Sequence, residues 1–147
     1  MSSEIYRELI LDYYRNPRNF GKVEPHDISA RDSNPLCGDE IEIQVRVSPD
    51  KKIGEIKFTG KGCAVSQAST SMLTELAKGK PLEWVKELSK QDIFKMLGTE
   101  DLGPARVKCA LLSMKVLKTG VYGYLGTRLD EDEDSKGNLK SLSRNNL

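Results

Sequence analysis

The chain has 147 residues, and its 23 Lys and Arg nearly balance its 22 Asp and Glu, for a formal net charge of +1. This length fits one compact domain, and 37% hydrophobic residues suffice for one core, which excludes two full domains and wholesale disorder. The balanced charge argues against nucleic-acid binding, and no stretch approaches the roughly 18 apolar residues of a membrane span.

The chain has three Cys and one His. An odd number of Cys without a C-x-x-C pair excludes a complete disulfide framework and a thioredoxin-type redox pair. The N-terminal residues lack the basic-then-apolar order of a signal peptide. We therefore expect a cytoplasmic protein whose reduced thiols serve metal binding or chemistry, and we expect His26 to be an ordinary exposed residue.

The first half of the chain predicts one helix and two strands. Apolar residues at helical spacing predict an amphipathic helix over residues 3–15, and the Pro-containing residues 16–36 predict an extended or looping connection. Residues 40–47 alternate polar and apolar side chains, which is typical of a half-buried strand. Turn residues follow, and residues 53–59 predict the antiparallel partner of that strand.

The second half predicts helices. They span residues 64–78, a segment beginning at Pro81, residues 92–97 and residues 105–122. The acidic run at 130–134 and the polar residues after it predict a disordered tail over 128–147, which leaves residues 1–127 as the domain. The fold class expected is α+β, a small antiparallel sheet of about three strands with helices packed on one side.

Each Cys lies at a predicted break between elements. Cys37 precedes the strand at 40, Cys63 lies at a strand-to-helix turn, and Cys109 lies near the start of the last helix. A helix N-terminus favours the thiolate form, as do the neighbouring cations Lys61 and Lys108. Three thiolates need a fourth ligand for zinc or iron, and the carboxylate nearest in sequence belongs to Asp39. The alternative is that the three Cys are packing residues and Asp39 is a surface turn residue.

Four segments carry a resemblance to a known family. The stretches NPLCGD at 34–39, GKGCAVSQAS at 60–69 and PARVKC at 104–109 resemble the three Cys motifs of the iron–sulfur cluster assembly scaffolds, the group of IscU, SufU and the NifU N-terminal domain. The stretch YRNPRNFG at 14–21 resembles the N-terminal segment of that family. The resemblance covers roughly residues 4–125.

The resemblance implies an IscU-like scaffold, mainly non-enzymatic, on which a [2Fe–2S] cluster is built from iron and from sulfur supplied by a cysteine desulfurase. The cluster then passes to acceptor apo-iron–sulfur proteins. Cys37, Cys63 and Cys109 match the ligand and sulfur-accepting cysteines, and Asp39 matches the labile-ligand aspartate. Zinc occupies the same cysteines in the cluster-free form of many members. Whether a cluster lies within one chain or bridges a homodimer stays open.

Two departures bear on the subtype. Lys108 stands where IscU-type scaffolds carry a His, and a protonated lysine is a poor metal ligand, so Asp39 is expected as the fourth ligand. Residues 102–108 also differ from the segment that a dedicated Hsp70 chaperone recognises, so the resemblance lends that partner little support. Both features favour the SufU type, a zinc-dependent sulfurtransferase that accepts persulfide sulfur. The stretch between Cys63 and Cys109, however, is short for the insert that SufU-type proteins carry.

For the scaffold, we expect Cys109 to accept the persulfide, because a short segment at the start of a helix can move. Lys108 would give electrostatic support by keeping the nearby thiols ionised.

Overall fold

The computed structural model describes residues 3–35, 38–98 and 103–132. Three strands and five helices make up these residues: α1 (Ser3–Arg15), β1 (Ile28–Asn34), β2 (Asp39–Val47), β3 (Ile53–Lys61), α2 (Ala64–Ala77), α3 (Leu82–Lys86), α4 (Lys90–Leu97) and α5 (Gly103–Asp132). The α+β class with a three-stranded antiparallel sheet is therefore confirmed.

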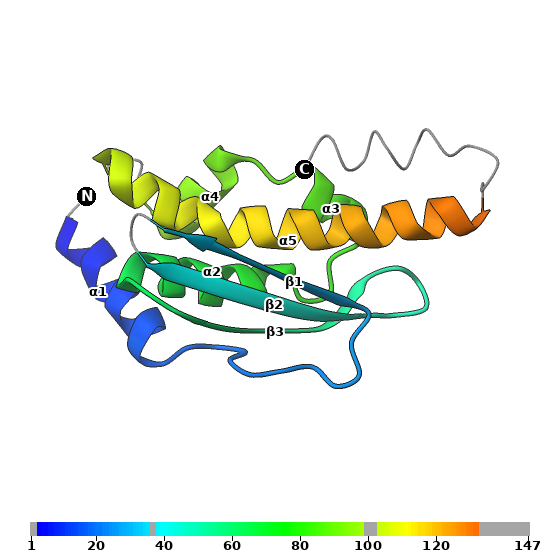
Figure 1. The fold of residues 1–147 in the computed structure, drawn as a ribbon. Helices are drawn as coiled ribbons and strands as arrows, with labels where there is room; N and C mark the ends of the chain where they lie inside the picture. The colour runs from blue at the N-terminus through cyan, green and yellow to red at the C-terminus, as the bar shows by residue number, and fades with distance from the viewer. Residues whose placement is uncertain (1–2, 36–37, 99–102, 133–147) are drawn as a thin grey trace.

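The strands lie in the order β1–β2–β3, and both neighbouring pairs are antiparallel. Asn34 pairs with Asp39 across the first hairpin, and Glu40 pairs with Lys61 across the second. This register places the end of β1, the start of β2 and the end of β3 together at one end of the sheet (Figure 1). Loops that follow or precede those strand ends must therefore meet there.

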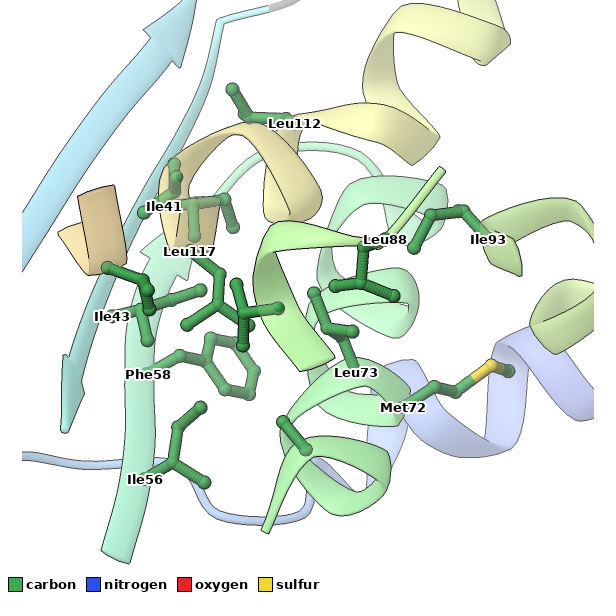
Figure 2. Close-up of a cluster of buried hydrophobic side chains, with 14 of the residues drawn as sticks. Ile41, Ile43, Ile56, Phe58, Met72, Leu73, Leu88, Ile93, Leu112 and Leu117 are labelled. Carbon is green, nitrogen blue, oxygen red and sulfur yellow. The ribbon is translucent and has the colours of Figure 1, made fainter. Parts of the chain in front are cut away.

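The core lies between one face of the sheet and the helices. Figure 1 shows α5 running along the sheet with α2 beside it, and α2 packs extensively on both α1 and α5. The apolar residues of β2 point into this layer, whereas Glu40, Glu42 and Arg46 alternate with them on the opposite face. Figure 2 shows side chains from sheet and helices meeting in the core, among them Ile41, Ile43, Ile56, Phe58, Met72, Leu73, Leu88, Ile93, Leu112 and Leu117.

The residues before β1 cross the polar face of the sheet. The Gly21 amide donates to the Phe58 carbonyl on β3, and the Asp27 amide donates to the Val45 carbonyl on β2, both at 2.8 Å. Between these two contacts, the Val23 amide donates to the side chain of Gln44. The segment therefore covers part of the sheet face that carries no helix.

Strand β1 lies within residues 16–36, for which the sequence predicted only an extended or looping connection. Its only inward apolar residues are Ile28 and Ala30, so its own sequence carries too little alternation to predict a strand. Pairing with β2 supplies the backbone hydrogen bonds of β1. Helix α5 lies close over β1 at Gly120. A Cβ at Gly120 would lie 2.8 Å from Cγ2 of Ile28, so the close approach of α5 to β1 requires glycine there.

An ion pair also joins β1 to α5. The ammonium of Lys115 lies 2.9 Å from a carboxylate oxygen of Asp32. The hydrogen bond from Lys115 holds the pKa of the Asp32 carboxyl below its ordinary value. The contact is partly exposed, so its contribution to stability is small.

The last helix also differs from its predicted bounds. It begins at Gly103 and ends at Asp132, whereas the pattern predicted residues 105–122. Tyr124 and Leu125 pack against the core cluster, and that packing carries the helix past Gly123. Residues 128–132 are thus helical, and residues 133–147 lie outside the described residues. The division into residues 1–127 and a tail at 128–147 stays a prediction.

Helix α1 matches its predicted bounds but buries fewer apolar residues than its pattern indicated. Ile10 and Tyr13 pack against the core, whereas Ile5 and Leu9 are exposed. Among the described helices, none combines the length and the apolar character that crossing a membrane requires.

Candidate metal centre

Three potential ligands from distant parts of the chain meet at the end of the sheet where β1 ends, β2 begins and β3 ends. Asp39 is the first residue of β2, Cys63 lies between β3 and α2, and Cys109 lies in the second turn of α5. One ligand atom from each, a carboxylate oxygen and two Sγ atoms, lie within 4.8 Å of one another. The strand register and the packing of α5 on β1 and α2 produce this convergence.

Asp39 is oriented by the start of α2. Its side chain is fully buried, and its Oδ1 accepts a hydrogen bond of 2.8 Å from the backbone amide of Cys63. The thiol of Cys63 points at the other oxygen, Oδ2, with 3.8 Å between Sγ and Oδ2. Cys63 is the N-cap of α2 and makes no capping hydrogen bond with its own side chain. The carboxylate of Asp39 therefore satisfies one of the free amides at this helix start, where negative charge is favourable.

Gly62 allows the carboxylate to come this close. The backbone φ of Gly62 is +135°, and a Cβ there would lie 2.1 Å from Oδ1 and 2.7 Å from Cα of Asp39. Contacts that short do not occur between non-bonded atoms, and the second involves the backbone of a strand. Gly62 is therefore needed both for its backbone conformation and for the space beside Asp39.

The two thiols differ in exposure. Cys63 is partly exposed, whereas only 2% of the Cys109 surface is exposed. Cys63 lies at the expected break between a strand and a helix. Cys109 lies near the start of α5, as expected, but it belongs to the buried core cluster. A full turn of α5 precedes Cys109, so its side chain packs with the core residues of the helix.

The remaining predicted site residues lie as follows. Cys37 lies outside the described residues. Lys108 and Lys61 are exposed next to Cys109 and Cys63 in sequence, so their electrostatic support of the thiols stays a prediction. His26 is exposed, as expected, with its Nδ1 at 3.1 Å from the Val23 carbonyl oxygen.

The donor set suits a thiophilic metal. Two thiols with one carboxylate are ligands for zinc or for iron in a sulfur-rich site, and a buried carboxylate beside thiols is costly unless a cation or hydrogen bonds compensate it. Sequence reasoning missed the hydrogen bond from the Cys63 amide to Asp39, because no pattern within either motif indicates it. Partial exposure of Cys63 leaves one side of the three donors open to solvent.

Known proteins resemble this chain over most of its length. The family of NifU-like N-terminal domains matches residues 5–131. The zinc-dependent sulfurtransferase SufU of Bacillus subtilis is 40% identical over an alignment of 133 residues that covers 80% of this chain and 89% of the relative. The iron–sulfur cluster assembly scaffold protein IscU of Aquifex aeolicus is 36% identical over 132 residues, which cover 89% of this chain and 83% of that relative.

Solved structures share the fold. A protein of Fervidobacterium islandicum AW-1, described as an iron–sulfur cluster assembly scaffold for the SUF system, superposes with a TM-score of 0.68 at 32% identity, covering 82% of this chain and 99% of that one. A NifU-like N-terminal protein of Brucella abortus has the same TM-score at 19% identity, which supports the fold alone. With its fold, its three motifs and the meeting of Asp39, Cys63 and Cys109, the chain belongs to the NifU-like N-terminal domain family, among relatives named IscU and SufU.

Proposed function

We propose that this protein is a scaffold on which an iron–sulfur cluster is assembled from iron and desulfurase-derived sulfur and from which it passes to acceptor proteins. The observation that carries the proposal is the meeting of Asp39, Cys63 and Cys109 at one end of the sheet. Relatives named as iron–sulfur cluster assembly scaffolds, from Aquifex aeolicus and Escherichia coli among others, support it.

The proposed cargo is a [2Fe–2S] cluster, held by Cys37, Asp39, Cys63 and Cys109. Thiolates bind iron strongly, whereas a carboxylate oxygen is a harder ligand and is displaced more easily. The hydrogen bond from the Cys63 amide gives Asp39 a partner that does not depend on the cluster. Asp39 is therefore the ligand most suited to open first when the cluster leaves.

In the cluster-free form, we propose that zinc occupies the same four residues. Zinc prefers four ligands, and three cysteines with one aspartate supply them. The observed donors fit this metal, because two thiols and a carboxylate already lie within 4.8 Å of one another. Zinc would hold the thiols as thiolates and protect them until iron and sulfur arrive.

Sulfur enters as a persulfide. In the proposed step, the Cys109 thiolate attacks the outer sulfur of a persulfide on the desulfurase; a new S–S bond forms at Cys109, the desulfurase S–S bond breaks, and the desulfurase thiolate leaves. Because Cys109 is buried, this step requires the first turns of α5 to open. Lys108, exposed beside it, is the proposed electrostatic support for the attacking thiolate.

A second function, that of a zinc-dependent sulfurtransferase, has two specific observations in its favour. The SufU relative from Bacillus subtilis is 40% identical to this chain, and Lys108 replaces the His that IscU-type scaffolds carry. In this alternative, zinc stays bound, and the chain accepts sulfur from a cysteine desulfurase and hands it on without building a cluster.

Anaerobic reconstitution with iron, cysteine and a cysteine desulfurase separates the two functions. The scaffold predicts visible absorption and Mössbauer spectra of a [2Fe–2S] cluster, followed by its transfer to an apo-ferredoxin. The sulfurtransferase predicts no cluster, one retained zinc and faster turnover by the desulfurase. Cys63→Ser and Cys109→Ser, treated with the desulfurase and analysed by mass spectrometry, locate the added sulfur; if only Cys109→Ser still gains sulfur, Cys109 is not the acceptor.

A further inference from the structure

Two buried hydroxyl groups join α2 to α5 beside Cys109. Ser69 on α2 and Ser113 on α5 both have 0% of their surface exposed. The Ser69 hydroxyl donates a hydrogen bond of 2.8 Å to the Ala110 carbonyl, and its Oγ lies 3.1 Å from Oγ of Ser113. Because the Ser69 proton is engaged by Ala110, the Ser113 hydroxyl is the donor in the second contact. The two hydroxyls thus form a short hydrogen-bonded chain from helix to helix.

Apolar side chains of the same two helices are buried as well. Ala68 and Met72 on α2 and Leu112 and Val116 on α5 are all buried. Burial of apolar surface is not directional, whereas a hydrogen bond requires a defined distance and angle between its donor and acceptor. Separation of Ser69 from α5 would instead break two hydrogen bonds of its buried hydroxyl, those to Ala110 and to Ser113, which is unfavourable. These hydrogen bonds therefore contribute to the register of α5 on α2, together with the packed side chains.

That register determines where the Cys109 thiol lies. Cys109 directly precedes Ala110 on α5, and Cys63 caps the same α2 that carries Ser69. One residue of helix corresponds to a rise of about 1.5 Å and a rotation of about 100°, whereas metal–ligand distances tolerate only about 0.2 Å. Asp39 and Cys63 are already tied together by a hydrogen bond. The position of Cys109 relative to that pair depends on how α5 is held.

We propose that Ser69 is a positioning residue of the metal centre, which acts through the Ala110 carbonyl to hold the Cys109 thiol at binding distance from Cys63 and Asp39. Ser113 supports it by donating to the Ser69 hydroxyl. This inference rests on the proposed function in one respect only, namely that these three residues bind a metal or a cluster.

Thr70 provides a matched control on the same helix. It is as fully buried as Ser69, and its Oγ1 donates a hydrogen bond of 2.7 Å to the Ser66 carbonyl within α2. Thr70→Val therefore removes a buried hydrogen bond of similar length, but one that does not reach α5. Any effect shared by Ser69→Ala and Thr70→Val reflects loss of stability, and an effect confined to Ser69→Ala reflects the position of α5.

The experiment adds cobalt(II) anaerobically to the full chain and to Ser69→Ala, Ser113→Ala and Thr70→Val. The visible d–d bands and the thiolate-to-metal charge-transfer bands report the ligand geometry, and competition with a chelator gives the zinc affinity. We expect Ser69→Ala to shift the cobalt bands and to weaken zinc binding about tenfold, which is typical of outer-shell residues. Ser113→Ala should shift the bands less, and Thr70→Val should lower only the urea midpoint of unfolding.

Cobalt bands and zinc affinity of Ser69→Ala that equal those of the unmodified chain would overturn the inference, as would equal losses in Thr70→Val. If Ser69→Ala does not fold, Ser113→Ala decides, and unchanged bands in that variant reject the proposal. An unmodified chain that gives no thiolate–cobalt bands at all would refute the metal centre, and the proposed function with it. Failure of the inference alone leaves the thiolate–cobalt bands of the unmodified chain intact.

Discussion

Replacement of Gly62 by alanine tests the geometry of the metal centre most directly. The added Cβ would lie 2.1 Å from Oδ1 and 2.7 Å from Cα of Asp39. Oδ1 can move only by giving up its hydrogen bond from the Cys63 amide, and Cα belongs to the first residue of β2. We therefore expect Gly62→Ala to displace the Asp39 carboxylate from the two thiols.

The expected loss of stability has two parts. A φ of +135° is strained for alanine, at about 1–3 kcal/mol, and forcing extra volume into packed structure adds about 1–3 kcal/mol. Together they give a loss of about 2–6 kcal/mol in the free energy of unfolding. For a chain of this size, each kcal/mol lowers the melting temperature by about 2–4 °C. A decrease of about 10 °C is a reasonable midpoint.

Gly79→Ala is the matched control, because it shares the positive φ without the collision. Gly79 has φ of +83°, and a Cβ there would meet nothing within 4 Å. The control should lose about 1 kcal/mol and keep the whole zinc centre.

Thermal unfolding of both variants, with and without zinc, separates strain from collision. We expect zinc to raise the melting temperature of Gly79→Ala as much as that of the unmodified chain and to raise that of Gly62→Ala much less. A Gly62→Ala variant that is no less stable than Gly79→Ala and keeps the full zinc response would refute the reasoning about Gly62 and Asp39.

Three further predictions concern Asp39, the ion pair of Asp32 and the C-terminal residues. Asp39→Ala should bind zinc about tenfold more weakly, which removes about 1.4 kcal/mol of zinc-dependent stabilisation in thermal unfolding; an unchanged response would show that Asp39 is no ligand. Asp32→Asn should lose at most about 1 kcal/mol in urea unfolding at neutral pH. Because Lys115 lowers the pKa of Asp32 in the folded chain, this loss should vanish as the pH falls through that lowered value, and a loss independent of pH would contradict the ion pair. Deletion of residues 133–147 should leave zinc affinity unchanged, whereas a lost site would show that the tail supports the centre.

The contrast between β2 and β1 shows why one strand was predictable and its neighbour was not. Residues 40–47 alternate apolar and polar side chains because one face of β2 is buried, and that local pattern is visible in the sequence. In β1, Ile28 and Ala30 are the only apolar residues facing inward, and the segment becomes a strand because β2 offers it hydrogen bonds and α5 covers it. The information that makes β1 a strand lies in its partners.

The same distinction applies to the end of α5. The apolar pattern predicted that the helix ends near residue 122, and the acidic run at 130–134 predicted a disordered tail from residue 128. Tyr124 and Leu125 pack on the core, and the hydroxyl of Tyr122 donates to the carbonyl of Lys86, the last residue of α3. These contacts are tertiary, so no pattern within residues 103–132 reports them.

The sequence alone determined the chemistry available to this protein. The types of ligand, their motifs and the absence of a His before Cys109 are properties of the residues themselves, and they indicated a sulfur-rich metal site with Asp39 as its weak member. Only the tertiary structure decided which residues meet and how accessible they are. Cys109 is buried, Asp39 is held by the Cys63 amide, and Ser69 ties α5 to α2. The physical reason is that periodicity is set by neighbours along the chain, whereas distances within the centre are set by strand register and helix packing between residues far apart in sequence.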